Sequence, residues 1–493
     1  MTKNGSAYLS SLRDERAIYI DGRRVADVTQ DPAFARAVAS AARLYDYQAD
    51  PAHTAAMTFR SPTSGEPVNR AWQLPRDLTE LVQRRHALEQ WAALSCGMFG
   101  RSPDHVASTL AGFRMGLSRF GAYDAKRAAA LDEYFTYARD NDLFLSYVII
   151  NPQADKARSA REQPDAQLVA SIVDEDAHGI TIRGAKMLAT GGIMANELLV
   201  SGFQALQPGD EAYAFTAAVP LSAKGLSLMS RRSYEYNASS VFDYPLSSQF
   251  DENDAIVYFD DVKIPWDRVF VCRDLKMAQA QWHDTRAHVF HNYQCMIRLT
   301  VKLRFLLGLV RMIAETNNII NYPQVRDTLG LMAARVNNIE ALVVAMEASG
   351  EVFEGFYVPN RSMLCTAQVI AQVTYPEIVE GIRSLAGGGL IMLPASAADF
   401  ADPHSNGIIM KTQRSPVATP VERVKLMKLA WDAVGSEFGS RHLQYEMFYS
   451  GAPYVTRGNA FRFFDWDGVK SAVEDFMDSY DLPAELRLES AAE

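Results

Sequence analysis

The spacing of hydrophobic and polar residues changes twice along the chain. In residues 78–99 apolar side chains recur every three or four positions, which predicts an amphipathic helix with one buried face. That face is predicted to contain Leu81, Leu88, Trp91 and Leu94. Residues 128–141 repeat the pattern, so the first third of the chain is expected to be mainly helical.

The middle of the chain, from Leu143 to about Pro265, follows a different pattern. Short apolar or alternating runs are separated by turn residues, which is typical of β-strands. The runs are LFLSYVII, QLVASIVDED, GITIRGAKML, ELLVSGF, YAFTAAVPL and AIVYFDDVKI. This part is therefore expected to be rich in β-structure.

Helical periodicity returns in the last part of the chain. Residues 296–316 are apolar over a broad face, as a helix inside a bundle must be. Further helices are expected at 324–350, 364–386 and 420–447. The order of helices, strands and helices predicts an α+β fold, and not the alternating βαβ rhythm of a dinucleotide-binding fold.

The same order predicts three domains. They are a mainly helical N-terminal domain of residues 1–142, a central β domain of residues 143–272, and a C-terminal helical bundle with a tail, residues 273–493. The glycine run LAGGGLIMLP, residues 385–394, follows a predicted helix and lacks the GxGxxG spacing of a phosphate-binding loop. We interpret it as the end of a helix followed by a turn.

Composition narrows the possible partners. The 493 residues are 48% hydrophobic and 22% charged, so the chain is expected to fold throughout. A net charge of -10 without a lysine or arginine block argues against nucleic acid and anionic membranes as partners. The polar N-terminus and the lack of an apolar run of membrane-spanning length predict a cytoplasmic protein. The four scattered cysteines form no CxxC and predict neither disulfides nor a zinc site.

Several phrases keep the same order as in one known family. They are GRSPDH, ARDNDLFLSYVIINPQADKAR, ITIRGAKMLATGGIMANELLVSGF, FDDVKIPWDRVF and KLAWDAVGSEFGSRHLQYEMFYSG. These phrases resemble the large component of 4-hydroxyphenylacetate 3-monooxygenase. The resemblance implies an acyl-CoA dehydrogenase-like fold, with an N-terminal helical domain, a central β-barrel-like domain and a C-terminal helical bundle.

The resemblance also implies an activity. Members are two-component monooxygenases: a separate NAD(P)H:flavin reductase makes FADH2, which reacts with O2 in the oxygenase to give a C4a-hydroperoxide. This species would hydroxylate a small phenolic substrate, free or carrier-bound, at the ortho position to give a catechol. The protein must then supply a dry pocket and groups that favour phenolate. The family further implies a homotetramer or homodimer assembled through the C-terminal bundle.

The resemblance places the flavin against three segments. Gln153 and Lys156, Thr190, and the loop Tyr449-Ser450-Gly451 are the implied cofactor-binding residues. Other interpretations remain open for each segment. The NPQ sequence ending at Gln153 is also a turn, the glycines after Thr190 also suit a hairpin, and aromatic residues near Tyr449 also suit a bundle core.

On the substrate side the sequence departs from the family. Members are expected to offer an Arg and a Tyr from an RSPDY-like motif and a His from a THxxxNPQ-like strand. Here Arg101 is retained, but His105 takes the place of the Tyr and Tyr147 the place of the His. Arg101 is expected to hold a phenolate or carboxylate, and His105 is a candidate base. Alternatively, His105 is a solvated residue in the first turn of a helix.

A second pair of histidines, His288 and His291, is a further candidate for the base. In chlorophenol-oxidising relatives a histidine of this region is expected to fill that role. The spacing of three also suits a metal pair on one helical face, but no HExxH-like carboxylate pattern accompanies it, so no metal is predicted.

Four alternatives to the hydroxylase remain. An oxidative dehalogenase of halophenols belongs to the same family. A 4-hydroxybutyryl-CoA dehydratase would need cysteine ligands where Arg101 and His105 stand, which argues against it. An acyl-CoA dehydrogenase would need a carboxylate base, for which Glu340 and Glu380 are candidates. A non-catalytic flavin-binding relative is disfavoured because Arg101 and both flavin-side residues Gln153 and Thr190 are retained.

Overall fold

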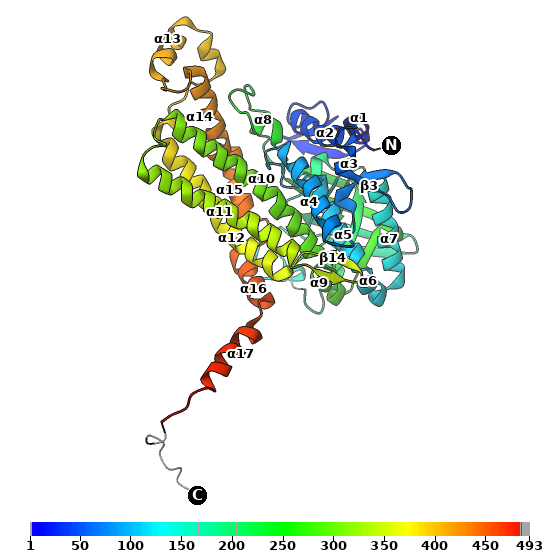
Figure 1. Cartoon of the computed structure of the whole chain (residues 1–493). Coiled ribbons are helices and arrows are strands. Elements are labelled where there is room, and N and C mark those ends of the chain that lie inside the picture. The colour runs from blue at the N-terminus through cyan, green and yellow to red at the C-terminus, as the bar shows by residue number, and fades with distance from the viewer. Residues whose placement is uncertain (1, 153, 166, 204–205, 484, 486–493) are drawn as a thin grey trace.

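The computed structural model confirms the α+β order of helices, strands and helices (Figure 1). It describes residues 2–152, 154–165, 167–203, 206–483 and 485. The helices of the first part are α1 (Gly5–Ser11), α2 (Ala35–Ala49), α3 (Thr54–Met57), α4 (Leu78–Ala93), α5 (Pro103–Met115), α6 (Leu117–Tyr123) and α7 (Ala125–Asp140).

Helix α4 begins where predicted but ends six residues early. Asp77 caps it by accepting a hydrogen bond from the N–H of Glu80 at 2.9 Å, and Cys96 and Gly97 then reverse the chain with positive φ angles of 54° and 72°. At Gly97 a Cβ would lie 2.7 Å from the main-chain nitrogen of Lys302, so the close approach of helix α10 favours glycine. Leu94 therefore lies beyond the helix and is only half-buried.

Two sheets form the central part. One has the strand order β2-β1-β10-β11-β7-β6 and the other β12-β9-β8-β5. Their bounds are β1 (Ala17–Ile20), β2 (Arg23–Arg24), β5 (Leu145–Val148), β6 (Ser171–Asp176), β7 (Gly179–Lys186), β8 (Glu197–Val200), β9 (Phe215–Pro220), β10 (Leu226–Ser230), β11 (Ala255–Pro265) and β12 (Val269–Cys272). The short helix α8 (Ser247–Phe250) lies between β10 and β11 in the chain.

Strand β1 was not predicted from the hydrophobic pattern. It comes from the first part of the chain, yet it pairs in parallel with β10, with Ile18 opposite Leu228. Polar residues on both sides leave β1 as the short run AIYI, whereas β5 and β8, also of four residues, lie within longer apolar runs. Two hairpins were missed for the same reason: β3 (Thr58–Arg60) with β4 (Pro67–Asn69), and β13 (Glu351–Phe353) with β14 (Phe356–Val358).

The last part is a helical bundle. Its helices are α9 (Leu275–Asp284), α10 (Ala287–Thr316), α11 (Pro323–Ala348), α12 (Arg361–Ala386), α13 (Pro403–Thr412), α14 (Pro420–Val434), α15 (Glu437–Phe448), α16 (Pro453–Phe463) and α17 (Trp466–Met477). Helix α10 starts nine residues before the predicted start at Met296, and every residue from Ala287 to Thr300 is buried. The predicted helix 420–447 is two helices, because Ser436 starts a new one by accepting from the N–H of Gly439 at 3.1 Å.

The glycine run at the end of α12 behaves as predicted. The helix ends at Ala386, Gly387 follows with a positive φ of 57°, and a short 3-10 turn spans Gly387–Leu390. The run is a helix end and turn.

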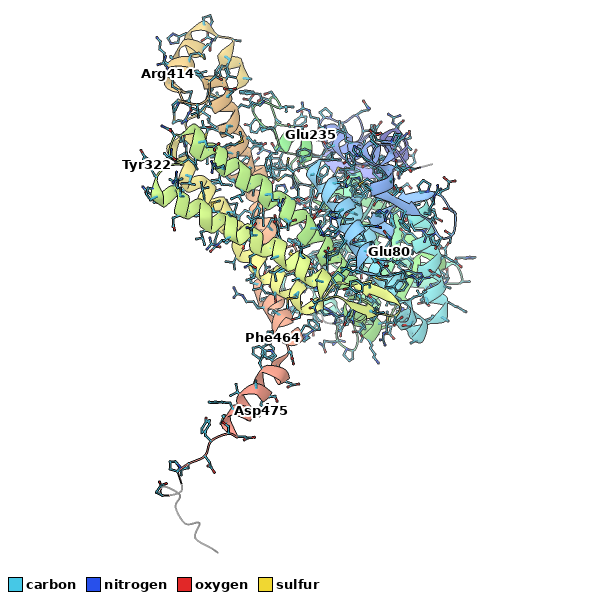
Figure 2. The ribbon with its side chains drawn as sticks, in the orientation of Figure 1. Glu80, Glu235, Tyr322, Arg414, Phe464 and Asp475 are labelled. Carbon is cyan, nitrogen blue, oxygen red and sulfur yellow. The ribbon has the colours of Figure 1, made fainter. Side chains whose placement is uncertain are left out.

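The C-terminal helix α17 projects away from the rest of the molecule (Figure 1). Phe464 and Asp475 lie on this arm, clear of the bundle (Figure 2). No residue of α17 is buried, although Trp466, Val469, Val473 and Phe476 are all large and apolar. The arm therefore carries an uncovered apolar face.

Helix α11 is the one helix in the described part of the chain that is long and apolar enough, by length and composition alone, to cross a membrane. A helix of a packed bundle meets the same criteria. Helix α11 packs against α10 and α12, while Leu331 and Val344 on it remain about half exposed.

Candidate active site

Four predicted residues meet where α5, β5 and α10 come together. Arg101 directly precedes α5, His105 lies in its first turn, Tyr147 lies in β5 and His291 in the second turn of α10. All four are buried, with 9% or less of each exposed. His105 is completely buried, so its interpretation as a solvated residue is wrong.

The start of α5 is fixed by buried polar contacts. Ser102 occupies the cap position, but its hydroxyl bonds to the carboxylate of Asp104 and caps no main-chain N–H. Pro103 is the first helical residue, a position where a proline costs no hydrogen bond. Gln294 of α10 donates to the other carboxylate oxygen of Asp104 at 3.0 Å, which ties the two helices together beside the site.

The aromatic side chains form a compact group that we call the ring cluster: His105, Tyr147 and His291. The His105 ring stacks on Tyr147 with centroids 5.1 Å apart and meets His291 edge-on at 4.3 Å. Tyr147 and His291 are 5.4 Å apart. Thus the imidazole and the phenol that exchanged places in the sequence still lie against each other.

The guanidinium of Arg101 lies against this cluster. Its central carbon is 4.9 Å from the ring centre of Tyr147, and 5.4 and 5.8 Å from those of Tyr445 and Tyr449 in the α15 region. Burial opposes the positive charge, but attraction to Tyr147, Tyr445 and other groups keeps the pKa of Arg101 above its usual value. The site thus contains a permanent buried positive charge faced by aromatic rings.

The contacts of His105 indicate its tautomer. Nη1 of Arg101 contacts Nε2 of His105, and because a guanidinium only donates hydrogen bonds, Nε2 must accept. The ring proton then lies on Nδ1, which is buried and has no partner among the described residues. Burial, with the charge of Arg101, lowers the pKa of His105 well below its ordinary value. His105 is therefore a neutral ring with a free donor.

The contacts of His291 indicate the opposite arrangement. The hydroxyl of Thr109 lies 3.3 Å from the main-chain oxygen of His105 and 3.2 Å from Nδ1 of His291, and when it donates its proton to the main-chain oxygen it accepts from Nδ1. Nε2 of His291 is left as an acceptor, with no partner among the described residues. Burial, followed by the charge of Arg101, lowers the pKa of His291 well below its ordinary value. A neutral imidazole with a free acceptor nitrogen is the form a general base requires.

His288 is directed to a different group. Its ring contacts His283, with centroids 4.7 Å apart, and burial lowers its pKa to about 3. The structure thus separates the two histidines that their sequence spacing had suggested as a pair.

One further cluster contains possible metal ligands. The nitrogen and sulfur atoms of His105, His291 and Cys295 lie within 4.8 Å of one another. Nη1 of Arg101 contacts both His105 and, at 3.9 Å, the sulfur of Cys295. A fixed positive charge against two of the three ligands opposes a bound cation, and burial raises the pKa of the Cys295 thiol to about 11, away from a thiolate.

On the predicted flavin side, several buried hydroxyls lack partners. They belong to Tyr445, Tyr449 and Ser450, and none has a hydrogen bond within the described residues. Gly451 follows with a positive φ of 112°. Unpaired hydroxyls in an aromatic setting suit the polar edge of a neutral ring system such as isoalloxazine, so these residues fit the implied cofactor.

The other predicted cofactor residues do not have buried, unpaired hydroxyls of this kind. Thr190 is buried and its hydroxyl donates to Asp254 at 2.5 Å. The next residue, Gly191, does not form a hairpin turn, because β7 and β8 on either side of it belong to different sheets. Its φ is 71°, and a Cβ there would lie 3.3 Å from the main-chain oxygen of Arg101. Lys156 is exposed in a turn, and Gln153 lies outside the described residues.

A network of charges behind the site was missed in the sequence. Arg441 of α15 pairs with Glu252 at 2.7 Å and with Asp254 at 2.7 Å. Oε2 of Glu252 accepts from the main-chain N–H of Arg101 at 2.8 Å. No local pattern reveals such a network, because its members are up to 340 positions apart; of the three side chains, only Arg441 lies within a phrase that resembles the family.

Two family models together cover nearly the whole chain. Residues 4–271 match the family model described as 4-hydroxyphenylacetate 3-hydroxylase N terminal, and residues 278–478 match the model described as 4-hydroxyphenylacetate 3-hydroxylase C terminal. Over 480 residues the chain is 33% identical to the 4-hydroxyphenylacetate 3-monooxygenase oxygenase component of Geobacillus sp. (strain PA-9), with 96% of each chain covered.

Two further similarities are informative. The chain is 34% identical over 492 residues to the (3S)-3-amino-3-(3-chloro-4-hydroxyphenyl)propanoyl-[peptidyl-carrier protein SgcC2] monooxygenase of Streptomyces globisporus, covering 97% of this chain and 91% of that one. It also resembles the crystal structure of the oxygenase component (HpaB) of 4-hydroxyphenylacetate 3-monooxygenase complexed with FAD and 4-hydroxyphenylacetate. The TM-score is 0.92 at 30% identity, over 97% of this chain and 98% of that chain.

Proposed function

The chain belongs to the 4-hydroxyphenylacetate 3-hydroxylase family, and we propose that it converts a phenol to a catechol, with Arg101 holding the phenolate and His291 acting as base. It is an FAD-dependent aromatic monooxygenase, the oxygenase component of a two-component system. Such a component depends on a separate reductase for FADH2 and uses O2 as co-substrate.

One observation carries the proposal. The buried guanidinium of Arg101 and the neutral imidazole of His291, with its free acceptor nitrogen, both lie against the side-chain ring of Tyr147. A phenolate is a better nucleophile toward electrophilic oxygen than a phenol, so hydroxylation benefits from a base and a cation at the substrate hydroxyl. Nε2 of His291 can take the proton, and the guanidinium of Arg101 can stabilise the resulting charge.

The other residues of the site orient the substrate and exclude water. The free Nδ1–H of His105 donates a hydrogen bond to the substrate, and Tyr147 covers one side of the ring cluster. Burial raises the pKa of Tyr147 to about 12, so it remains a neutral hydroxyl at working pH. The flavin, when bound in its reduced form FADH2, supplies the electrons that activate O2. Tyr449, Ser450 and Thr190 hold it, with Gln153 and Lys156 as further contacts implied by the family.

The test is an oxygen-uptake experiment on the full chain with FADH2 and a panel of phenols, including 4-hydroxyphenylacetate, tyrosine and a chlorophenol. We expect a catechol from at least one phenol, with product formed in proportion to O2 consumed. Release of H2O2 alone with every phenol would refute the proposal. Chloride release with no gain of catechol from unhalogenated phenols would instead support an oxidative dehalogenase of halophenols.

We further propose a homotetramer or homodimer in the cytoplasm. The uncovered apolar face of α17 and the half-exposed Leu331 and Val344 of α11 support self-association, since exposed apolar faces of this kind are normally covered. Removing residues 465–493 should reduce the number of subunits per assembly, as measured by sedimentation equilibrium.

A further inference from the structure

A basic cluster lies outside the ring cluster, where the starts of α10 and α12 meet the end of α16. We call it the basic pocket. It contains His283, Arg286, His288, Arg361, Arg462 and Phe463. The proposed hydroxylation uses none of these residues.

Contacts between side chains hold the pocket together. Arg361, the first residue of α12, donates to the main-chain oxygen of His283 at 2.6 Å. Its guanidinium lies 4.7 Å from the ring centre of Phe463, and the His283 ring lies 6.3 Å from the same ring on α16. His283 in turn contacts His288, with ring centres 4.7 Å apart. The pocket therefore joins three helices.

The positive charge of this pocket is not balanced. In the described part of the chain, neither Arg361 nor Arg462 has a carboxylate within ion-pair distance. The nearby Glu351 is already paired with Arg286 at 2.8 Å, and Asp284 is exposed to solvent. Burial, and then repulsion from Arg286, lowers the pKa of Arg361 below its usual range. Arg361 thus has a partly buried positive charge without a counter-ion, and an anion bound beside it would offset that charge.

Two helix starts add to the positive potential. Helix α10 has 30 residues, and Arg286 at its cap position has a positive φ of 75° and makes no side-chain cap. Helix α12 has 26 residues and starts at Arg361, where the side chain of Asn360 accepts from the N–H of Met363 and leaves the other first-turn N–H groups without a side-chain cap. The first-turn N–H groups of long helices attract anions. Both starts are located at the basic pocket.

Two buried nitrogen atoms of the pocket also lack partners. Nδ1 of His283 and Nδ1 of His288 have no hydrogen bond among the described residues. His288 is only 7% exposed, so solvent does not readily satisfy its nitrogen. Buried polar atoms without a partner are rare in folded proteins and indicate a missing ligand or water.

We propose that the basic pocket binds a phosphate group. The unpaired guanidinium groups of Arg361 and Arg462, with the two helix starts, provide more positive charge than one carboxylate would neutralise. A phosphate carries up to two negative charges and can accept hydrogen bonds from several donors at once. Two sources share this chemistry: the phosphates of a flavin nucleotide, and the phosphate ester of a pantetheine arm that carries a substrate. The inference goes beyond the hydroxylation proposal, because phosphate binding can be measured without turnover.

The first test is calorimetric titration of the full chain with inorganic phosphate in a chloride buffer of low ionic strength. Arg462→Gln and Arg361→Gln should each weaken binding about tenfold or more, the loss of one charged hydrogen-bond donor. Arg457→Gln is the matched control, since Arg457 lies on the same helix and is exposed without belonging to the pocket. Because Arg462 is exposed and Arg361 is not, Arg462→Gln answers the question if Arg361→Gln does not fold.

A second comparison identifies the source of the phosphate. If FAD occupies the pocket, Arg462→Gln should weaken the binding of FAD more than that of riboflavin, which has no phosphate. If a carrier arm occupies it, the variant should leave FAD binding unchanged and weaken the binding of pantetheine 4'-phosphate. Absence of saturable phosphate binding in the unmodified protein, or equal binding by Arg462→Gln and Arg457→Gln, would overturn the proposal.

Discussion

The main-chain N–H of Arg101 donates to Oε2 of Glu252 at 2.8 Å, so a carboxylate of the central part holds the loop that carries the arginine proposed to bind the substrate. The other oxygen of that carboxylate is 2.7 Å from Arg441, which comes from the C-terminal bundle. The position of Arg101 therefore depends on all three parts of the molecule at once. This dependence can be tested without altering any residue of the ring cluster.

Replacing Glu252 by glutamine should move Arg101 without removing it. The amide oxygen can still accept from the main chain, but the ion pair with Arg441 is lost. We expect kcat/KM for the phenol to fall about tenfold to a hundredfold, because small misplacements of a positioning group carry costs of that size. Steady-state kinetics would show this, with FAD affinity unchanged. Glu437→Gln removes an exposed ion pair with Arg232 and should behave as wild type.

Arg101→Lys should retain the positive charge of the site but lose the planar guanidinium, which can donate two parallel hydrogen bonds. The affinity for a phenolic substrate should fall about tenfold to a hundredfold, as expected for losing one or two charged hydrogen bonds. Equilibrium titration of the FAD-bound protein with substrate measures the effect. Substrate affinity equal to that of the unmodified protein would mean that Arg101 does not hold the phenolate.

Exchanging single histidines should rank the three candidate bases. Asparagine at position 291 can still donate to Thr109 but cannot accept a proton, so His291→Asn should lower the rate of hydroxylation about 10²- to 10⁴-fold, the usual contribution of a general base. His105→Asn and His288→Asn should have smaller effects, since Nε2 of His105 already accepts from Arg101 and His288 contacts His283. Rapid-mixing measurement of product decides between them. A larger loss in His105→Asn would make His105 the base.

The pKa directions predict a second property of the same site. Because His291 stays neutral well below pH 6.5, the rate of hydroxylation should not decline near that pH as it would with an ordinary histidine base. A pH profile of single-turnover hydroxylation between pH 5.5 and 8 tests this. A decline with a midpoint near 6.5 would contradict it.

Two hydroxyls on the flavin side should contribute to cofactor binding but not to stability. Tyr449→Phe and Ser450→Ala should each weaken FAD binding about two- to tenfold, the value of one net hydrogen bond. The cofactor-free variants should be at least as stable as the parent protein, because each loses a buried hydroxyl that had no partner. Flavin titration and urea denaturation provide the two readouts. Tyr454→Phe, at a residue that is 79% exposed, is the control for both.

Buried histidines should make the fold less stable in mild acid. The pKa of His288 is about 3 in the folded protein, whereas an unfolded histidine titrates near 6.5, so below pH 6.5 the unfolded chain binds one more proton at this position. The free energy of unfolding therefore decreases as the pH is lowered. At pH 5 the buried His288 destabilises the folded protein by about 2 kcal/mol relative to neutral pH. In urea denaturation without phosphate, His288→Gln should lose less stability between pH 7 and pH 5 than the parent protein. Equal losses would contradict the assignment.

The sequence predicted the fold well where a pattern is long. Helices α4, α11 and α12 contain several repeats of the helical period and were placed to within a few residues at one end or both, whereas α2, with 15 residues, was not predicted as a separate helix. Short elements gave no such signal. Strand β1 and the break between α14 and α15 were missed because four residues, or one Gly-Ser step, change the pattern too little.

Motif comparison predicted the residues of the site, but it did not predict which of two neighbouring histidines belongs to it. Motif comparison selected Arg101, His105, Tyr147 and His291, and the structure brings all four together. The motif comparison could not separate His291 from His288, since both lie on one helix three positions apart. Only their neighbours, Thr109 for one and His283 for the other, distinguish them.

By itself, then, the sequence determined the order of the three parts, the family, and which side chains are candidates for the chemistry, because these are recorded in local periodicity and in short motifs. The tertiary structure decided which nitrogen of each histidine is free, what holds Arg101 in place, and where positive charge is left unbalanced. Those properties depend on hydrogen-bond partners and burial contributed by residues more than a hundred positions away, and no local pattern encodes such contacts.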